Sequence, residues 1–186
     1  METTPDFNEE AGKRAPGPNT MSSDFVQKLV DNYRNNQLGV INTKMEMEDA
    51  HSICFDLATL KKFISDIENE VQKVDATITT NHLGVRFYYA AYPEIKNWDM
   101  MENTAIEKNY AGKHTLVMIP TLKRPNPEGE TLNYDFNPLD AATYTENSGI
   151  EEKENIMALA KKPAGLVFSQ NHGDLNPPGS KMGESF

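Results

Sequence analysis

The chain has 186 residues, a length that suits one domain with short tails and a core large enough to fold without disulfides. Its formal net charge is −10, from 28 acidic and 18 basic side chains, which disfavours binding to nucleic acid or to an anionic membrane surface. Cys54 is the only cysteine, which excludes an internal disulfide and a thiolate metal cluster.

The ends of the chain are rich in Pro, Gly and charged residues, a composition that buries too little surface to order a chain. We therefore predict a disordered tail over residues 1–21, a single α+β domain over residues 22–178 and a flexible tail over residues 179–186. No stretch reaches the roughly 18–20 apolar residues of a membrane span, and the start lacks the apolar core of a signal peptide. The expected location is the cytoplasm.

A first helix is predicted after the N-terminal tail. Ser22 or Ser23 can cap it, and Phe25, Leu29 and Tyr33 follow at the four-residue spacing of one helix face. Gly39 predicts its end, and residues 40–49 then read as a connector.

The centre of the chain predicts a strand, a long amphipathic helix and another strand. The first strand covers residues 50–55, and Asp56 then caps a helix over residues 57–74. The apolar seam of this helix consists of Leu57, Leu60, Ile64, Ile67, Val71 and Val74. On the strand at residues 84–92, one face is predicted to be core; it carries Val85, Phe87, Tyr89 and Ala91.

The second half of the chain completes the predicted fold. Residues 114–121 form a strand that is apolar on both faces, and Pro120 predicts that pairing stops near its end. A helix over 148–162, a short strand over 165–168 and a turn over 171–174 follow. The fold class is therefore α+β, with an antiparallel or mixed sheet of about three to five strands, packed by the 57–74 helix and two further helices.

Four segments, HSICFDLATLKKFI, GVRFYYAAYP, HTLVMIPT and NHGDLNPP, occur in this order between His51 and Pro178. Together they resemble a group of small uncharacterised bacterial proteins. The resemblance implies a bacterial origin and a single compact domain, and it carries no catalytic residue over to this chain.

The most suggestive binding residues lie on the strand at residues 84–92. Arg86, Tyr88 and Tyr92 share one face there, and Trp98 stands in the long loop that follows. Arg, Tyr and Trp are the residue types enriched in protein-binding hot spots. The alternative is that these rings are packed, that Arg86 pairs with a carboxylate and that the Trp98 loop only covers a sheet edge. We predict a non-enzymatic interaction or adaptor protein with a protein partner; the RNP-type motif of RNA-binding sheets is absent.

Two other functions remain open. His172, also a candidate binding residue, is followed by Asp174 in the predicted turn, and His51, His114 or Cys54 could join them in a small hydrolase or transferase. The alternative is an ordinary turn and a small buried cysteine. No metal-ligand spacing is present, so no metal or cofactor is expected. Finally, the 57–74 seam could make the chain a homo-oligomeric structural subunit.

Overall fold

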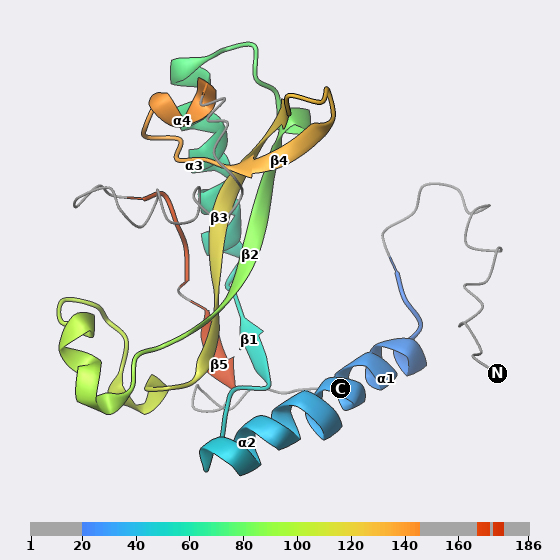
Figure 1. The fold of residues 1–186 in the computed structure, drawn as a ribbon, viewed down its shortest axis with the longest axis vertical. Helices are drawn as coiled ribbons and strands as arrows, with labels where there is room; N and C mark the ends of the chain where they lie inside the picture. Colours follow the sequence, from blue (N-terminus) through green and yellow to red (C-terminus); the bar gives the residue numbers. More distant parts are fainter. Residues whose placement is uncertain (1–19, 146–166, 172, 177–186) are drawn as a thin grey trace.

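The computed structural model describes residues 20–145, 167–171 and 173–176. These residues form a mixed α+β fold with two small antiparallel sheets (Figure 1). One sheet pairs β1 (Ser52–Cys54) with β5 (Asp174–Asn176); the other has the order β2 (Leu83–Ala91), β3 (His114–Pro125), β4 (Thr131–Asp135). The α+β class is confirmed, but the strands form two sheets and not one. Residues 1–19 of the predicted N-terminal tail, the predicted C-terminal tail and the predicted helix over 148–162 lie outside the described residues.

The long helix, α3 (Leu57–Val74), has the predicted bounds because its start is fixed locally. The Asp56 carboxylate accepts a hydrogen bond from the Thr59 N–H at 2.8 Å and caps the first turn. Phe63, Ile67 and Val71 are its buried residues, whereas Ile64 is 48% exposed. The buried stripe is therefore rotated away from the N-terminal part of the predicted seam.

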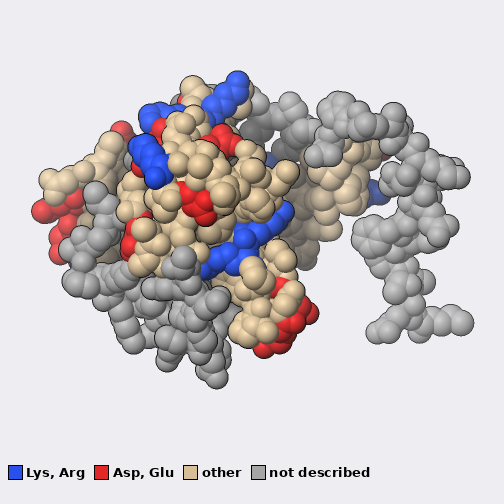
Figure 2. Space-filling view, turned by 90° about the horizontal axis from the view of Figure 1, so that it is seen from above, with Lys and Arg blue, Asp and Glu red and all other residues tan. Residues whose placement is uncertain are grey.

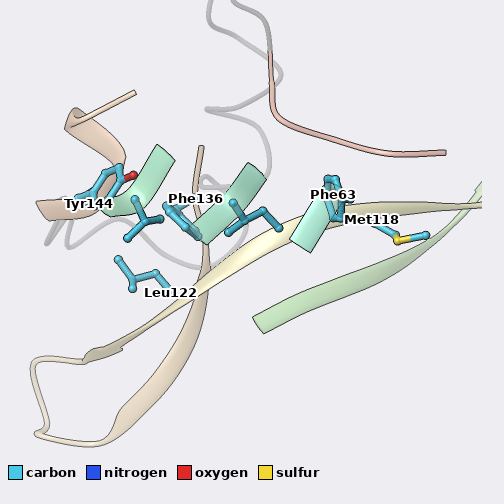
Figure 3. Close-up of a cluster of buried hydrophobic side chains, with 7 residues drawn as sticks. Phe63, Met118, Leu122, Phe136 and Tyr144 are labelled. Atoms are coloured by element: carbon cyan, nitrogen blue, oxygen red, sulfur yellow. The ribbon is translucent and has the colours of Figure 1, made fainter. Parts of the chain in front are cut away.

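The main core is a group of buried side chains that we call the large cluster (Figure 3). It joins the α3 stripe to residues of β3 and of the segment after β4; its members are Phe63, Ile67, Val71, Met118, Leu122, Phe136 and Tyr144. The rings of Phe136 and Tyr144 meet edge to face at 5.3 Å, and Phe168 stacks on Phe63 at the same centroid distance.

β2 and β3 form the longest ladder of the fold, and it continues past Pro120. The prediction that pairing fails at this proline is wrong. The Pro120 carbonyl accepts from the Phe136 N–H at 3.1 Å, so the nitrogen of Pro120 faces the same side, just beyond the end of β4. The missing donor therefore removes no bond to β2.

The first helical region is longer than predicted. Ser22 caps α1 (Ser23–Asn32), a π-helical segment covers Tyr33–Leu38, and α2 covers Gly39–Met45. Gly39 does not end the helix, because its φ of −58° and ψ of −40° are ordinary helical values. The helix ends at Glu46, whose φ of 51° is left-handed.

The C-terminal described residues also differ from the prediction. Residues 167 and 168 are not in a strand; Gln170 instead bridges Met118 through two backbone hydrogen bonds of 2.8 and 3.2 Å. Asp174 begins β5 and is not part of a turn. Gly173 allows the backbone before β5 to lie close to β1, since a Cβ at that position would lie 2.4 Å from the Ile53 Cγ2 atom.

The surface carries charges of both signs. Figure 2 looks onto the end of the molecule near β4 and α4 (Ala142–Thr145) and shows Lys and Arg side chains interspersed with acidic ones. In the described ranges, no helix is both long enough and apolar enough to cross a membrane.

Candidate functional site

β2 lies at one edge of the three-stranded sheet, and within the described residues it pairs only with β3. The Tyr92 N–H donates to the Lys113 carbonyl at 3.0 Å, so the backbone N–H and C=O groups of Tyr92 point toward the neighbouring chain segment that leads into β3. Because backbone groups in a strand point alternately to its two sides, the N–H and C=O groups of Val85, Phe87 and Tyr89 point away from β3. These residues therefore line the outer edge of the sheet.

The sequence of this edge strand lacks several of the features that usually protect such edges. Lysines, prolines and short length normally prevent such edges from pairing with other chains. β2 has nine residues and the sequence LGVRFYYAA, in which Arg86 is the only charged residue. The edge is therefore long and weakly charged.

Two aromatic side chains stand exposed on one face of β2. Tyr89 is 91% exposed and Phe87 is 50% exposed. The prediction that these residues belong to the core is wrong. Period-two spacing shows which side chains share a face, but not which face is covered. Met118 on the neighbouring strand is buried in the large cluster, while Phe87 directly opposite it is half exposed.

Arg86 and Tyr88 lie on the other face of β2 and are held by β4. Arg86 Nη1 donates to Asp135 Oδ1 at 2.7 Å, and Nη2 donates to the Asn133 carbonyl at 2.8 Å. The Tyr88 hydroxyl donates to the other carboxylate oxygen of Asp135. Burial, and then this hydrogen bond, raise the pKa of Tyr88 above its usual value. Arg86 thus pairs with a carboxylate, as the alternative interpretation predicted, and this carboxylate belongs to β4.

Tyr92 and Trp98, two of the predicted binding residues, are packed inside the protein. They belong to a second group of buried residues, the small cluster, which also contains Ala50 and Leu175. Trp98 lies in a 3₁₀ segment over Ile95–Met101. The structure therefore does not bring these two side chains to the surface that carries Arg86 and Tyr88.

Of the histidine and the aspartate in the predicted turn, the structure describes only the aspartate. His172 lies outside the described residues. Asp174 pairs with Cys54 in the β1–β5 ladder and accepts a hydrogen bond from the Tyr110 hydroxyl at 2.9 Å. Cys54 is exposed, so the reading as a buried small residue is wrong. The described part of the chain contains no group of three or more potential metal ligands.

Sequence reasoning missed a buried carboxylate beside a histidine. The side chain of Asp49 is wholly buried, and its Oδ1 accepts from the Ala50 N–H at 2.8 Å and from the His114 N–H at 2.7 Å. Its Oδ2 contacts Nδ1 of the His114 ring. The two residues are 65 positions apart and form no local motif, so no signal in the sequence links them.

A separate polar contact joins the first helical region to the residue just before β1. Arg34 Nη2 lies 3.3 Å from Nδ1 of His51. Burial, and then the negative charge of Asp49, raise the pKa of Tyr33. Tyr33 and Arg34 open the π-helical segment, a feature that is frequent at functional sites.

Comparison with known proteins provides no relative for this chain. A scan against protein-family models, a search of curated proteins and a search of solved structures each found no match. Function is therefore inferred from the geometry of the chain itself.

Proposed function

We propose that this chain is a non-enzymatic interaction protein of the bacterial cytoplasm, which binds an extended segment of a protein partner along the outer edge of β2. The observation that carries the proposal is Tyr89, an almost fully exposed aromatic side chain on a long and weakly charged edge strand. Addition of a strand to such an edge is a recurring mode of peptide recognition.

The two faces of β2 define the chemistry of the partner segment. Its backbone would bond to the outward N–H and C=O groups of Val85, Phe87 and Tyr89. Side chains of a paired strand alternate between the faces, so one set would meet Phe87 and Tyr89 and the other would meet the side that holds Arg86. The expected partner segment therefore has apolar side chains on one face and polar side chains on the other.

The Arg86, Tyr88 and Asp135 contacts support the proposal through preorganisation. A side chain that is already fixed loses less conformational entropy on binding, and this loss otherwise costs about 0.5–1.5 kcal/mol for each immobilised side chain. The Arg86 side chain is held by two hydrogen bonds to β4 yet keeps 41% of its surface exposed. It can therefore contact a partner without first being ordered.

The test compares two substitutions at one position in a pull-down from bacterial cells. Tyr89→Ala removes the exposed ring and keeps the outward N–H, whereas Tyr89→Pro removes both. We expect binding of the partner to be weakened by Tyr89→Ala and abolished by Tyr89→Pro. Because the Tyr89 N–H points away from β3, neither change should remove a bond of the β2–β3 ladder, and the melting temperature should change little.

Phe25→Ala is the matched control, since Phe25 is an exposed aromatic residue on α1. A partner retained by Tyr89→Pro would contradict strand addition at this edge. If light scattering finds a dimer that dissociates on the Tyr89→Pro substitution, the partner at this edge is a second copy of the chain. The 57–74 helix is a weaker basis for self-association, because Ile67 and Val71 of its seam are buried within the chain.

A further inference from the structure

The large cluster covers only part of the face of β2 that carries Phe87 and Tyr89. Leu83 and Val85, near the start of the strand, pack against this cluster. Phe87 and Tyr89 follow on the same face at two-residue spacing, yet they are 50% and 91% exposed. The cover over this face therefore ends between Val85 and Phe87.

One flank of α3 faces the side of the fold on which β2 lies. The Thr80 hydroxyl donates to Glu68 Oε1 at 2.8 Å, and Thr80 begins the 3₁₀ turn that leads directly into β2. Ile64 precedes Glu68 by four residues, and Leu57 precedes Ile64 by seven, so their side chains share this flank. In Figure 1, α3 runs alongside β2 and β3. Because Glu68 reaches the start of β2, the earlier residues of α3 lie further along the strand.

The opposite flank of α3 faces away from β2. Phe63 stacks on Phe168, which is two residues before Gln170. Gln170 bonds to both backbone groups of Met118, which therefore point away from β2, so this segment lies on the far side of β3. Successive residues of a helix point about 100° apart. Phe63 therefore turns toward the far side of β3, and Ile64 turns toward the side of β2.

Exposed apolar side chains of α3 and β2 stand at the same level of the fold. Phe63 and Met118 belong to the large cluster and are both drawn in Figure 3, and Met118 is paired with Phe87. Ile64, the next residue after Phe63, is 48% exposed. The exposed apolar residues of these two elements, which we call the flank surface, are Leu57, Ile64, Phe87 and Tyr89.

We propose that the partner segment at the outer edge of β2 is recognised by branched aliphatic side chains that pack against the flank surface. The segment is the one in the proposed function, on which this inference rests. A strand added to β2 lies about 4.8 Å from it, and every second side chain then points to the face that α3 partly covers. These side chains contact Ile64 and Leu57 as well as Phe87 and Tyr89, and none of the four is charged.

The size of the flank surface favours one extended segment over a second copy of the chain. Its four side chains are few beside the roughly 20–30 residues that each partner contributes to a stable protein–protein interface. An added strand supplements such contacts with backbone hydrogen bonds along the edge. The expected occupant is therefore an extended segment with valine or isoleucine at alternate positions, residue types that favour strands.

The test measures binding of two synthetic peptides to the full chain by fluorescence anisotropy. Each peptide has nine residues, the length of β2, with serine or lysine at every second position. The first carries valine at the remaining positions. The second carries threonine there, which has a similar shape but a hydroxyl that is costly to bury. We expect the valine peptide to bind the native chain at least about tenfold more tightly.

Substitutions on α3 identify the contact. Ile64→Ala should weaken binding of the valine peptide about fivefold and should affect the threonine peptide less, because the lost contact is apolar. Val74→Ala is the matched control, since Val74 is 46% exposed on the same helix but lies about 15 Å further along it. It should change neither affinity.

The outcomes separate this inference from the proposed function. If Tyr89→Pro abolishes binding but the native chain does not prefer valine, or Ile64→Ala leaves the preference unchanged, strand addition stands and the role of the flank surface is overturned. No binding of either peptide, or binding that survives Tyr89→Pro, would contradict both. A native dimer that dissociates on the Ile64→Ala substitution would assign the flank surface to a second copy of the chain and overturn the proposal.

Discussion

The two groups of buried residues differ in composition and in what surrounds them. The large cluster joins α3, β3 and the segment after β4 through apolar and aromatic side chains. The small cluster is gathered from short stretches before β1, after β2 and within β5, and it lies beside the buried polar residue Asp49. Figure 1 shows β4 and α4 toward one end of the molecule, and β1 and β5 toward the opposite end.

This difference separates the stabilising part of the fold from the part available for function. Apolar packing of the kind found in the large cluster supplies most of the free energy of folding. The candidate functional groups lie outside it: His114 begins β3, and Tyr89 stands exposed toward the same end of the β2–β3 ladder. Substitutions in the two regions should therefore have different consequences.

The largest effect is expected within the large cluster. Ile67 is 3% exposed and Ile64 on the same helix is 48% exposed, so the same substitution can be compared at two sites. Ile67→Ala should lower the free energy of unfolding by about 2–5 kcal/mol, because it leaves a cavity. Ile64→Ala should cost about 1 kcal/mol or less. Chemical denaturation measures both, and equal losses would contradict the assignment of the buried stripe.

The next effect tests the tight packing around β1 and β5. Gly173→Ala would place a Cβ 2.4 Å from Ile53 Cγ2 and 2.8 Å from Phe55 Cζ. Overpacking of this kind typically costs about 1–3 kcal/mol. Gly129→Ala is a useful comparison, since a Cβ there meets nothing within 4 Å and only its φ of 85° opposes the change. A Gly173→Ala variant as stable as the native chain would contradict the close approach.

A smaller effect on stability, but a large one on binding, is expected at Tyr89. Removal of a hot-spot aromatic side chain typically costs about 2 kcal/mol or more of binding free energy, which corresponds to at least about a 30-fold loss of affinity. The free energy of unfolding should change by less than about 0.5 kcal/mol, because the ring is exposed. Titration with the captured partner measures the first quantity and denaturation the second. A stability loss above 2 kcal/mol would mean that Tyr89 is structural.

The smallest effect is a decline of stability in alkali. The pKa values of Tyr88 and Tyr110 are raised by burial and by their hydrogen bonds to carboxylates. Above the pKa of an unfolded tyrosine, about 10, the native chain therefore retains protons that the unfolded chain has lost, so stability falls as pH rises further. Tyr88→Phe should reduce this dependence in melting curves between pH 9 and about 11. An unchanged dependence would contradict burial of the phenol.

The sequence predicts local features well and non-local contacts poorly. The cap at Asp56 and the bounds of α3 depend on neighbouring residues, and both are confirmed. The pairing of β1 with β5 joins segments more than one hundred residues apart, and the Asp49–His114 contact also depends on tertiary structure. Alternation on β2 groups Phe87 with Tyr89 correctly, but the covering of that face is set by the rest of the fold.

Amide hydrogen exchange along β2 in the free chain tests the open edge most directly. The N–H groups of Arg86 and Tyr88 point toward β3, so we predict slow exchange for them. The N–H groups of Phe87 and Tyr89 point to the outer edge, so we predict fast exchange. This alternation, resolved by NMR, would support an edge that is available to a partner strand. Equal protection of all four amides would show that the edge is already covered and would contradict the proposed function.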